Sequence, residues 1–222
     1  HAGEDRRSGP FPHHSITAKL RGDDYKVWPK GWVGAHVTPS VPWPTKAHLV
    51  YFKNKEIHVI PGEGENAPCI FCQYTEATIN ETRETMLRFL SCWSWVEQKS
   101  IRVDNWTQGS HQFRAKRPDA INVVSSWPLD FDYWPKDLSK NAELSLAFYR
   151  EGLNLSNAPY SFLSFYKILD IIESGNNGQR KLLKKYVGKI EDRFAKDRLS
   201  ELGGNPDNRT IEDYIYQSGR LA

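Results

Sequence analysis

The segment from Pro159 to Ile172 constrains the fold of this chain more than any other part of the sequence. Its residues, PYSFLSFYKILDII, are apolar on nearly every side of a helix, and such a helix is typical of a buried position. Pro159 suits the first helical turn, because the N–H group that it lacks has no helical partner there in any case. The stretch Gly175-Asn-Asn-Gly178 ends the helix. We therefore predict a central, buried helix over 159–172, with further helices packed around it.

Three other helices are predicted in the same half of the chain. One begins near Ser139, a second covers residues 179–199, and a third begins at Thr210, which has Asp213 three residues further on. Apolar residues recur along each segment at the spacing of one helical face. The side chains predicted to point inward are Leu138, Ala142, Leu146, Tyr149 and Leu153, then Leu183, Tyr186, Val187, Ile190 and Phe194, and finally Ile211, Tyr214, Ile215 and Leu221.

The first half of the chain is predicted to be rich in strands. The runs 47–52 and 56–60 alternate apolar and polar residues on either side of Lys53-Asn54-Lys55, which indicates a hairpin. Residues 69–74 predict a further short strand.

One helix is predicted to interrupt these strands. Thr78 and Glu81 have the spacing of a capping box at its start, and Met86, Leu90 and Trp93 fall on one helical face. Strand-like alternation returns over 101–103, 112–114 and 121–124.

These patterns predict an α+β protein, in which a β-rich N-terminal module with one helix precedes an all-α bundle of four helices. We expect a disordered tail over residues 1–14 and the β-rich module over 15–127. A linker is expected over 128–138 and the helical bundle over 139–222. The sequence stops within the last predicted helix, so we expect the bundle to be truncated there.

The composition is that of a folded protein, with 39% hydrophobic and 26% charged residues. No apolar run approaches the roughly 18 residues needed to cross a bilayer, and the polar start of the chain has no signal-peptide pattern. We therefore expect a cytoplasmic protein without a membrane partner. The net charge of +3 is too small to require a nucleic-acid partner, so a basic surface has to be argued locally.

Cys69 and Cys72 have the Cys-x-x-Cys spacing of metal and redox sites. A zinc site needs four ligands, and only His58 and Cys92 could complete one, if the fold brought them close. The pair lies within a predicted strand and not at a helix N-terminus, where a thiol pKa is lowered. We interpret both thiols as packing residues, and we expect no metal and no cofactor.

Three of the eight Trp residues lie near prolines, namely Trp28, Trp32 and Trp43. Aromatic rings of this kind either pack in a core or form a platform on which bases or sugars stack. The sequence leaves both interpretations open.

Residues 179–199 contain eight basic and three acidic residues, so their net charge of +5 exceeds that of the whole chain. Several cations on one side of a rigid helix suit phosphate recognition, because each neutralised phosphate releases condensed counterions. The alternative is an ordinary solvated helix face. Helical phase groups the candidate nucleic-acid-binding residues, which are Lys181, Lys184, Lys185 and Lys189.

Three stretches of the helical half carry a resemblance to known proteins. They are residues 146–154 (LAFYREGLN), 159–169 (PYSFLSFYKIL) and 214–222 (YIYQSGRLA), of which the second is the most specific. They resemble the HEPN superfamily of four-helix domains and, more closely, MauJ-like proteins, which take their name from a methylamine-utilisation locus. The first half is only vaguely similar to the β-rich part of MauJ-like chains. The resemblance implies an HEPN-like bundle over 139–222 and a homodimer formed through it.

HEPN proteins often act as metal-independent RNA endonucleases, with an Arg and a His in an R-x4–6-H motif on the last long helix. Arg220 matches the Arg, and the His would fall three to five residues past Ala222. The pair suits the chemistry, because an imidazole shuttles a proton near neutral pH and a guanidinium stabilises the charged phosphorane. The resemblance therefore makes Arg220 the candidate catalytic residue, and the alternative is a surface Arg. Many members lack the motif and serve as binding or scaffolding modules.

Two main functional hypotheses follow. The first is an HEPN-like RNA-binding protein that is an endoribonuclease when full length. The second is a non-enzymatic accessory or protein-interaction module of the MauJ type. A third hypothesis makes the Trp-rich first half a carbohydrate- or ligand-binding module.

Overall fold

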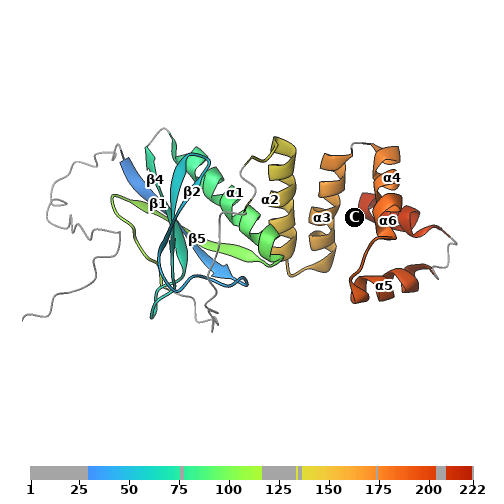
Figure 1. Ribbon diagram of the computed structural model, residues 1–222, viewed down its shortest axis with the longest axis horizontal. Helices are drawn as coiled ribbons and strands as arrows, with labels where there is room; N and C mark the ends of the chain where they lie inside the picture. Colours follow the sequence, from blue (N-terminus) through green and yellow to red (C-terminus); the bar gives the residue numbers. More distant parts are fainter. Residues whose placement is uncertain are drawn as a thin grey trace, which may run out of the picture. The chain divides into compact units, whose positions relative to one another are not determined.

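The computed structural model describes residues 30–75, 78–116, 134, 137–173, 175–203 and 209–221, and of residues 176 and 219–221 it describes the backbone. The chain divides into two compact units, residues 1–136 and 137–222 (Figure 1). The first unit holds a sheet with one helix, and the second is helical. The predicted α+β class is thus confirmed. The predicted limits of the tail, the module and the linker stay predictions.

A five-stranded antiparallel sheet forms the first unit. Its strands are β1 (Lys30–Pro39), β2 (His48–Phe52), β3 (Lys55–Ile60), β4 (Cys69–Thr75) and β5 (Ile101–Gly109), in the order β2-β3-β4-β1-β5. The predicted hairpin is confirmed, since β2 pairs with β3 around a turn at Lys53 and Asn54. Both turn residues take positive φ angles, 49° and 60°, as the central residues of a type I′ turn do.

The strand predicted over 112–114 is wrong, because β5 ends at Gly109 and no strand follows directly. Instead, the segment after β5 folds back towards the loop between β3 and β4. The N–H of Ala67 donates to the carbonyl of Ala115 at 3.0 Å, and the Arg114 guanidinium donates to the carbonyl of Pro61 at 2.6 Å. The strand predicted over 121–124 lies outside the described residues.

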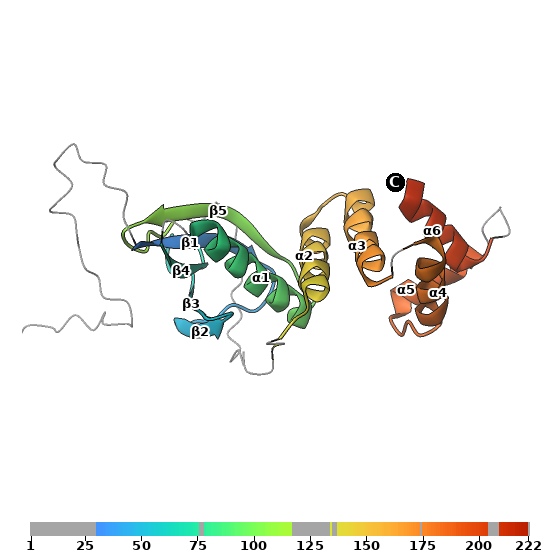
Figure 2. The same ribbon diagram turned by 90° about the horizontal axis from the view of Figure 1, so that it is seen from above.

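Helix α1 (Ile79–Glu97) packs against one face of the sheet (Figures 1 and 2). It joins β4 to β5, and both strands run antiparallel to β1, which lies between them. This arrangement is a split β-α-β unit. Its predicted apolar face is confirmed, since Met86, Leu90 and Trp93 are buried.

The predicted capping box at the start of α1 is wrong. Thr78 does occupy the N-cap position, but its hydroxyl makes no hydrogen bond to the first turn of the helix. That oxygen accepts instead from the N–H of Thr75 at 2.9 Å. The competing bond ties the helix start to the end of β4, which the local sequence pattern does not reveal.

The core between α1 and the sheet is aromatic. Trp43 and Trp93 stack with ring centroids 4.4 Å apart, and Trp134 lies 5.2 Å from the ring of Phe89. The indole N–H of Trp43 donates to the carbonyl of Ile60 at 2.9 Å. Trp43 is therefore a core residue and not part of a stacking platform.

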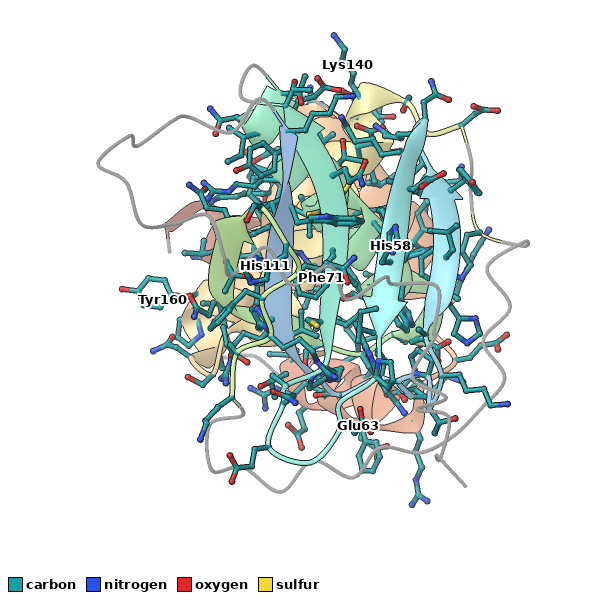
Figure 3. The ribbon with its side chains drawn as sticks, turned by 90° about the vertical axis from the view of Figure 1, so that its left-hand side faces the viewer. His58, Glu63, Phe71, His111, Lys140 and Tyr160 are labelled. Carbon is teal, nitrogen blue, oxygen red and sulfur yellow. The ribbon has the colours of Figure 1, made fainter. Side chains whose placement is uncertain are left out.

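The opposite face of the sheet carries His58 and Phe71 (Figure 3). Gly34 on β1 lies opposite Phe71 in the register, and Thr107 lies on its other side. A Cβ atom at Gly34 would come within 2.3 Å of the Phe71 ring and 2.7 Å of the Thr107 hydroxyl. The phenyl ring therefore occupies the space that a side chain at Gly34 would need. Of the other platform candidates, Trp32 is half-buried on this face, with its ring edge-on to His58 at 4.8 Å, and Trp28 lies outside the described residues.

The second unit begins with two antiparallel helices that lie side by side (Figures 1 and 2). These are α2 (Lys140–Asn154) and α3 (Ala158–Ile172), and they are followed by α4 (Asn176–Val187), α5 (Arg193–Gly203) and α6 (Ile211–Leu221). The predicted helix start at Ser139 is confirmed, because its hydroxyl accepts from the N–H of Ala142 at 3.2 Å. The start at Thr210 is confirmed by a bond from the N–H of Asp213 at 3.3 Å. Both are side-chain N-caps.

Helices α2 and α3 approach each other closely at Gly152. A Cβ atom there would lie 2.6 Å from the Phe165 ring. In the same region, the Ser161 hydroxyl donates to the carbonyl of Gly152 at 2.7 Å. The absence of a side chain at Gly152 therefore sets the spacing of the pair.

Helix α3 is less buried than predicted. Ser164 and Tyr166 are buried, but Tyr160 and Ile172 are 62% and 56% exposed. Within its own unit α2 covers one side of α3, and α4 and α6 contact it only locally. The prediction of a central, buried helix is wrong for this reason.

The helical unit has five described helices, one more than predicted. The extra helix arises because the segment 179–199 divides into α4 and α5. None of the helices in the described parts of the chain combines the length and the apolar character that a bilayer span needs.

Candidate nucleic-acid interface

The predicted lysines lie on α4, from its middle to its last turn, and in the turn after it. Three of them fall within about 100° of helix arc, because each residue advances the helix by about 100°. All four side chains are exposed, and no carboxylate in the described parts of the chain forms an ion pair with them. We call this set the basic surface: Lys181, Lys184, Lys185 and Lys189.

An aromatic ring lies beside two lysines of the basic surface. Tyr186 is 50% exposed, and the ammonium groups of Lys185 and Lys189 lie 5.1 Å and 5.6 Å from its ring centroid. These are cation–π distances. The sequence predicts Tyr186 to point inward, and helical phase places it on the apolar side of α4 with Leu182 and Leu183, but half of its surface faces solvent.

The single helix predicted over 179–199 is wrong. Helix α4 ends at Val187 with Gly188 as its C-cap, and the next helix begins at Arg193. Asp192 caps that second helix, since its carboxylate accepts from the N–H of Ala195 at 2.8 Å. A poor helix former followed by a strong N-cap residue is the signal that could have revealed the break. Lys189 therefore lies in the turn between the helices.

Phe194, in the first turn of α5, is 82% exposed. The prediction that it points inward is therefore wrong as well. In α5 the half-buried side chains are Ala195, Leu199 and Leu202, and at about 100° per residue Phe194 lies roughly a quarter-turn or more from all three. When one helical period is continued across a break between two helices, the residues after the break are assigned to the wrong side of their helix.

Helix α4 is anchored by a buried hydrogen-bond network that the sequence did not predict. Gln179 and Tyr166 are 5% and 7% exposed. The Tyr166 hydroxyl donates to the Gln179 side-chain carbonyl at 3.0 Å, and the Gln179 amide donates to the Asp170 carboxylate. Nothing in the sequence spacing indicates that Gln179 meets Tyr166 and Asp170, because it belongs to α4 and they belong to α3.

Arg180 lies beside the basic surface but bonds to its own unit. Its guanidinium lies 3.2 Å from the Asp213 carboxylate and 4.6 Å from the centroid of the Tyr216 ring. Arg180 therefore ties α4 to α6, and we assign it no role in binding.

Arg220 belongs to the last turn of α6. Its side chain lies outside the described residues. The catalytic role that the resemblance implies stays a prediction.

The cysteines of the first unit have the character of packing residues. Cys69, Cys72 and Cys92 are buried, and none of these three forms a disulfide. Burial raises the pKa of the Cys69 thiol to about 12 and that of the Cys72 thiol to about 11, so neither forms a thiolate readily near neutral pH. Among the described residues, no cluster of three metal-ligating side chains occurs.

His36 is buried in β1 and joined to two other segments. Its Nδ1 lies 3.4 Å from the N–H of Ala115, and its Nε2 lies 3.0 Å from the Thr107 hydroxyl. That hydroxyl donates to the carbonyl of Phe113 at 3.2 Å. The bonds are consistent when Nδ1 accepts and Nε2 donates, which is a neutral imidazole. Burial lowers the pKa of His36; the nearby Phe113 backbone carbonyl raises it, and the Arg114 charge lowers it further, so that the net shift is downward.

Comparison with known protein families gives a match in the helical half. Residues 145–222 match the family model described as methylamine utilization protein MauJ. The match covers most of α2 and all of the helices after it, including the basic surface. The predicted resemblance to MauJ-like proteins is therefore confirmed for this half, and the HEPN assignment stays a prediction. No curated protein and no solved structure matches the chain.

Proposed function

We propose that the MauJ-like helical half binds RNA through the basic surface. The observation that carries the proposal is a group of four exposed lysines without ion-pair partners among the described residues, two of which lie beside a half-exposed tyrosine. Ammonium groups in such a group neutralise phosphates and release counterions. The alternative of an ordinary solvated helix face does not explain why an exposed aromatic ring lies beside the lysines.

The proposal implies a strong dependence of affinity on salt. The logarithm of the binding constant falls linearly with the logarithm of the salt concentration, and each phosphate contact to a single strand adds about 0.7 to the steepness of that fall. Four contacts give a slope of about 2.8, so affinity falls about 50-fold between 50 mM and 200 mM salt. Fluorescence anisotropy with a labelled RNA at several salt concentrations measures this slope.

A charge-matched pair of variants tests the location of the interface. The first variant replaces Lys181, Lys184, Lys185 and Lys189 by Gln. The control replaces Lys30, Lys46, Lys99 and Lys140 by Gln, which are exposed lysines in other elements. We expect the first variant to lose most of the salt-dependent binding and the control to retain it. Equal losses would show that net charge alone drives binding, and the proposal would be dropped.

We further propose that Arg220 stabilises the reacting phosphate when the full-length dimer cleaves RNA in the cytoplasm. The resemblance to HEPN proteins supports this, together with the helical backbone at Arg220. In the native full-length protein, Arg220→Ala should abolish RNA cleavage. The affinity of the basic surface for RNA should stay within about twofold of the wild-type value. If the native protein leaves RNA intact, the nuclease proposal fails and the binding proposal stands.

A second candidate function is a non-enzymatic accessory module that docks a protein partner. The exposed apolar side chains at the ends of α3, Tyr160 and Ile172, favour it, because large exposed apolar groups often mark interaction sites. This candidate predicts a stable homodimer or complex that Ile172→Ser weakens. Sedimentation equilibrium of the wild type and of Ile172→Ser measures the oligomeric state. If both proteins are monomers at every salt concentration, this candidate function is contradicted.

A further inference from the structure

We infer that Tyr186 and Phe194 are base-stacking residues, and that the RNA held by the basic surface is single-stranded. The inference rests on the proposed RNA binding. It goes beyond that proposal by naming the form of the ligand and two residues that distinguish it. Neither residue carries charge, so neither is explained by attraction to phosphate alone.

The first step is the exposure of the two rings. Tyr186 is 50% exposed and Phe194 is 82% exposed, which makes Phe194 the most exposed large apolar side chain of the described residues. A phenyl ring left in water forfeits the stabilisation that burial supplies. The helix containing Phe194 has no buried residue, so the ring contributes little to the folding of its own unit.

The second step is the charge around each ring. Tyr186 has the Lys185 and Lys189 ammonium groups at 5.1 Å and 5.6 Å from its ring centroid. Along the chain, Phe194 stands between the exposed cations Arg193 and Lys196, which lie about 100° and 160° from it around the helix. Alternation of flat rings with cations is the pattern of single-strand binding surfaces, in which bases stack and phosphates are neutralised.

The third step is distance. Phe194 follows Tyr186 by eight positions, so the chain holds their Cα atoms within about 29 Å of each other at full extension. The turn over residues 188–192 lies between them. A strand of about 12 nucleotides is long enough to reach both rings, because comparable surfaces occupy about 4 to 16 nucleotides.

A duplex does not fit these observations. The bases of double-stranded RNA are stacked on one another and offer no free face to a protein ring, whereas unpaired bases can be splayed out onto aromatic side chains. Cations alone would suffice to bind duplex phosphates. The two exposed rings therefore favour a single strand.

The experiment compares four 12-unit probes by fluorescence anisotropy at one salt concentration: oligoadenylate, oligouridylate, an abasic strand of equal phosphate count, and an RNA duplex. The proteins are the wild-type full chain, Tyr186→Leu, Phe194→Leu and the quadruple Lys→Gln variant. Tyr160→Leu is the matched control, because Tyr160 is 62% exposed on a different helix. Leucine keeps most of the apolar volume, and far-UV circular dichroism verifies that each variant is folded.

We expect each ring variant to bind oligoadenylate about 5- to 150-fold more weakly, the range for one lost stacked base. Tyr160→Leu should bind like the wild type. The abasic strand should bind the wild type weakly and should be insensitive to both ring variants. The Lys→Gln variant should weaken every probe, the abasic strand included.

The outcomes separate the inference from the proposed function. If the ring variants bind all probes like the wild type while the Lys→Gln variant does not, the stacking inference is wrong and RNA binding stands. Duplex binding as tight as that of oligoadenylate also overturns the inference. If no probe binds, but vesicles containing anionic lipid do so through the same lysines, both the inference and the proposed function are wrong.

Discussion

Replacement of Gly152 by alanine tests the packing of α2 against α3. In most helix interiors this substitution stabilises, because alanine is favoured over glycine by about 1 kcal/mol. At Gly152 the new Cβ atom would lie 2.6 Å, 2.8 Å and 2.9 Å from three atoms of the Phe165 ring. We therefore expect the opposite sign.

The magnitude follows from two opposing terms. Carbon atoms pack at about 3.5 to 4.0 Å, so the phenyl ring must move by roughly 1 Å to accept the new atom. Such overpacking costs about 1 to 3 kcal/mol. Because the new Cβ atom crowds three atoms of the Phe165 ring, we expect a cost at the upper end of this range. Subtraction of the helix-propensity gain of about 1 kcal/mol leaves a net destabilisation of about 2 kcal/mol.

Urea unfolding followed by far-UV circular dichroism measures this change, because the signal comes mainly from the helices. All eight Trp residues lie between 28 and 134, so Trp fluorescence reports the first unit. With an m-value of about 2 kcal/mol/M, the midpoint of the circular dichroism transition should fall by about 1 M. The Trp transition should be the internal reference for the first unit.

Gly188→Ala is the matched control, because it makes the same chemical change at the end of α4. A Cβ atom there meets nothing within 4 Å, and the φ angle of −71° is compatible with any residue. We expect Gly188→Ala to be neutral or stabilising by up to about 1 kcal/mol. A midpoint for Gly152→Ala that equals or exceeds that of Gly188→Ala would refute the close-packing argument.

Three further predictions concern the two cores. Gly34→Ala should lower the urea midpoint of the Trp transition by at least 0.5 M, because the new Cβ atom meets the Phe71 ring within 2.3 Å; an unchanged midpoint would contradict this. The lowered pKa of His36 means that the unfolded chain binds the proton more readily, so unfolding free energy should fall as pH drops below about 6.5, and less steeply in His36→Gln; parallel pH profiles would disprove the role of His36. Tyr166→Phe should destabilise the helical unit by about 1 to 3 kcal/mol, because Gln179 loses its hydroxyl donor in a buried site; a circular dichroism transition like that of the wild type would count against the network.

The candidate site divides into a predicted part and an unpredicted part. The exposure of Lys181, Lys184 and Lys185 follows from helical phase, because charged side chains avoid the apolar interior. Tyr186 and Phe194 were predicted inward and are half or mostly exposed. Phase in a sequence assumes one continuous helix, and the break after Val187 removes that assumption for Phe194, although it does not explain the exposure of Tyr186, which precedes the break.

The sequence by itself determined the features that depend on neighbouring residues. The β2–β3 turn at Lys53 and Asn54, the caps at Ser139 and Thr210, and the apolar face of α1 all follow from local backbone preferences and side-chain period.

Only the tertiary structure decided which distant groups meet. The Phe71 ring over Gly34, the Phe165 ring against Gly152 and the hydroxyl of Tyr166 at a glutamine side chain join residues from different elements. Local period shows which side of an element is apolar and is silent about the element that covers it. The helix at 159–172 illustrates this, because its apolar sequence predicted full burial, whereas its own unit covers it only in part.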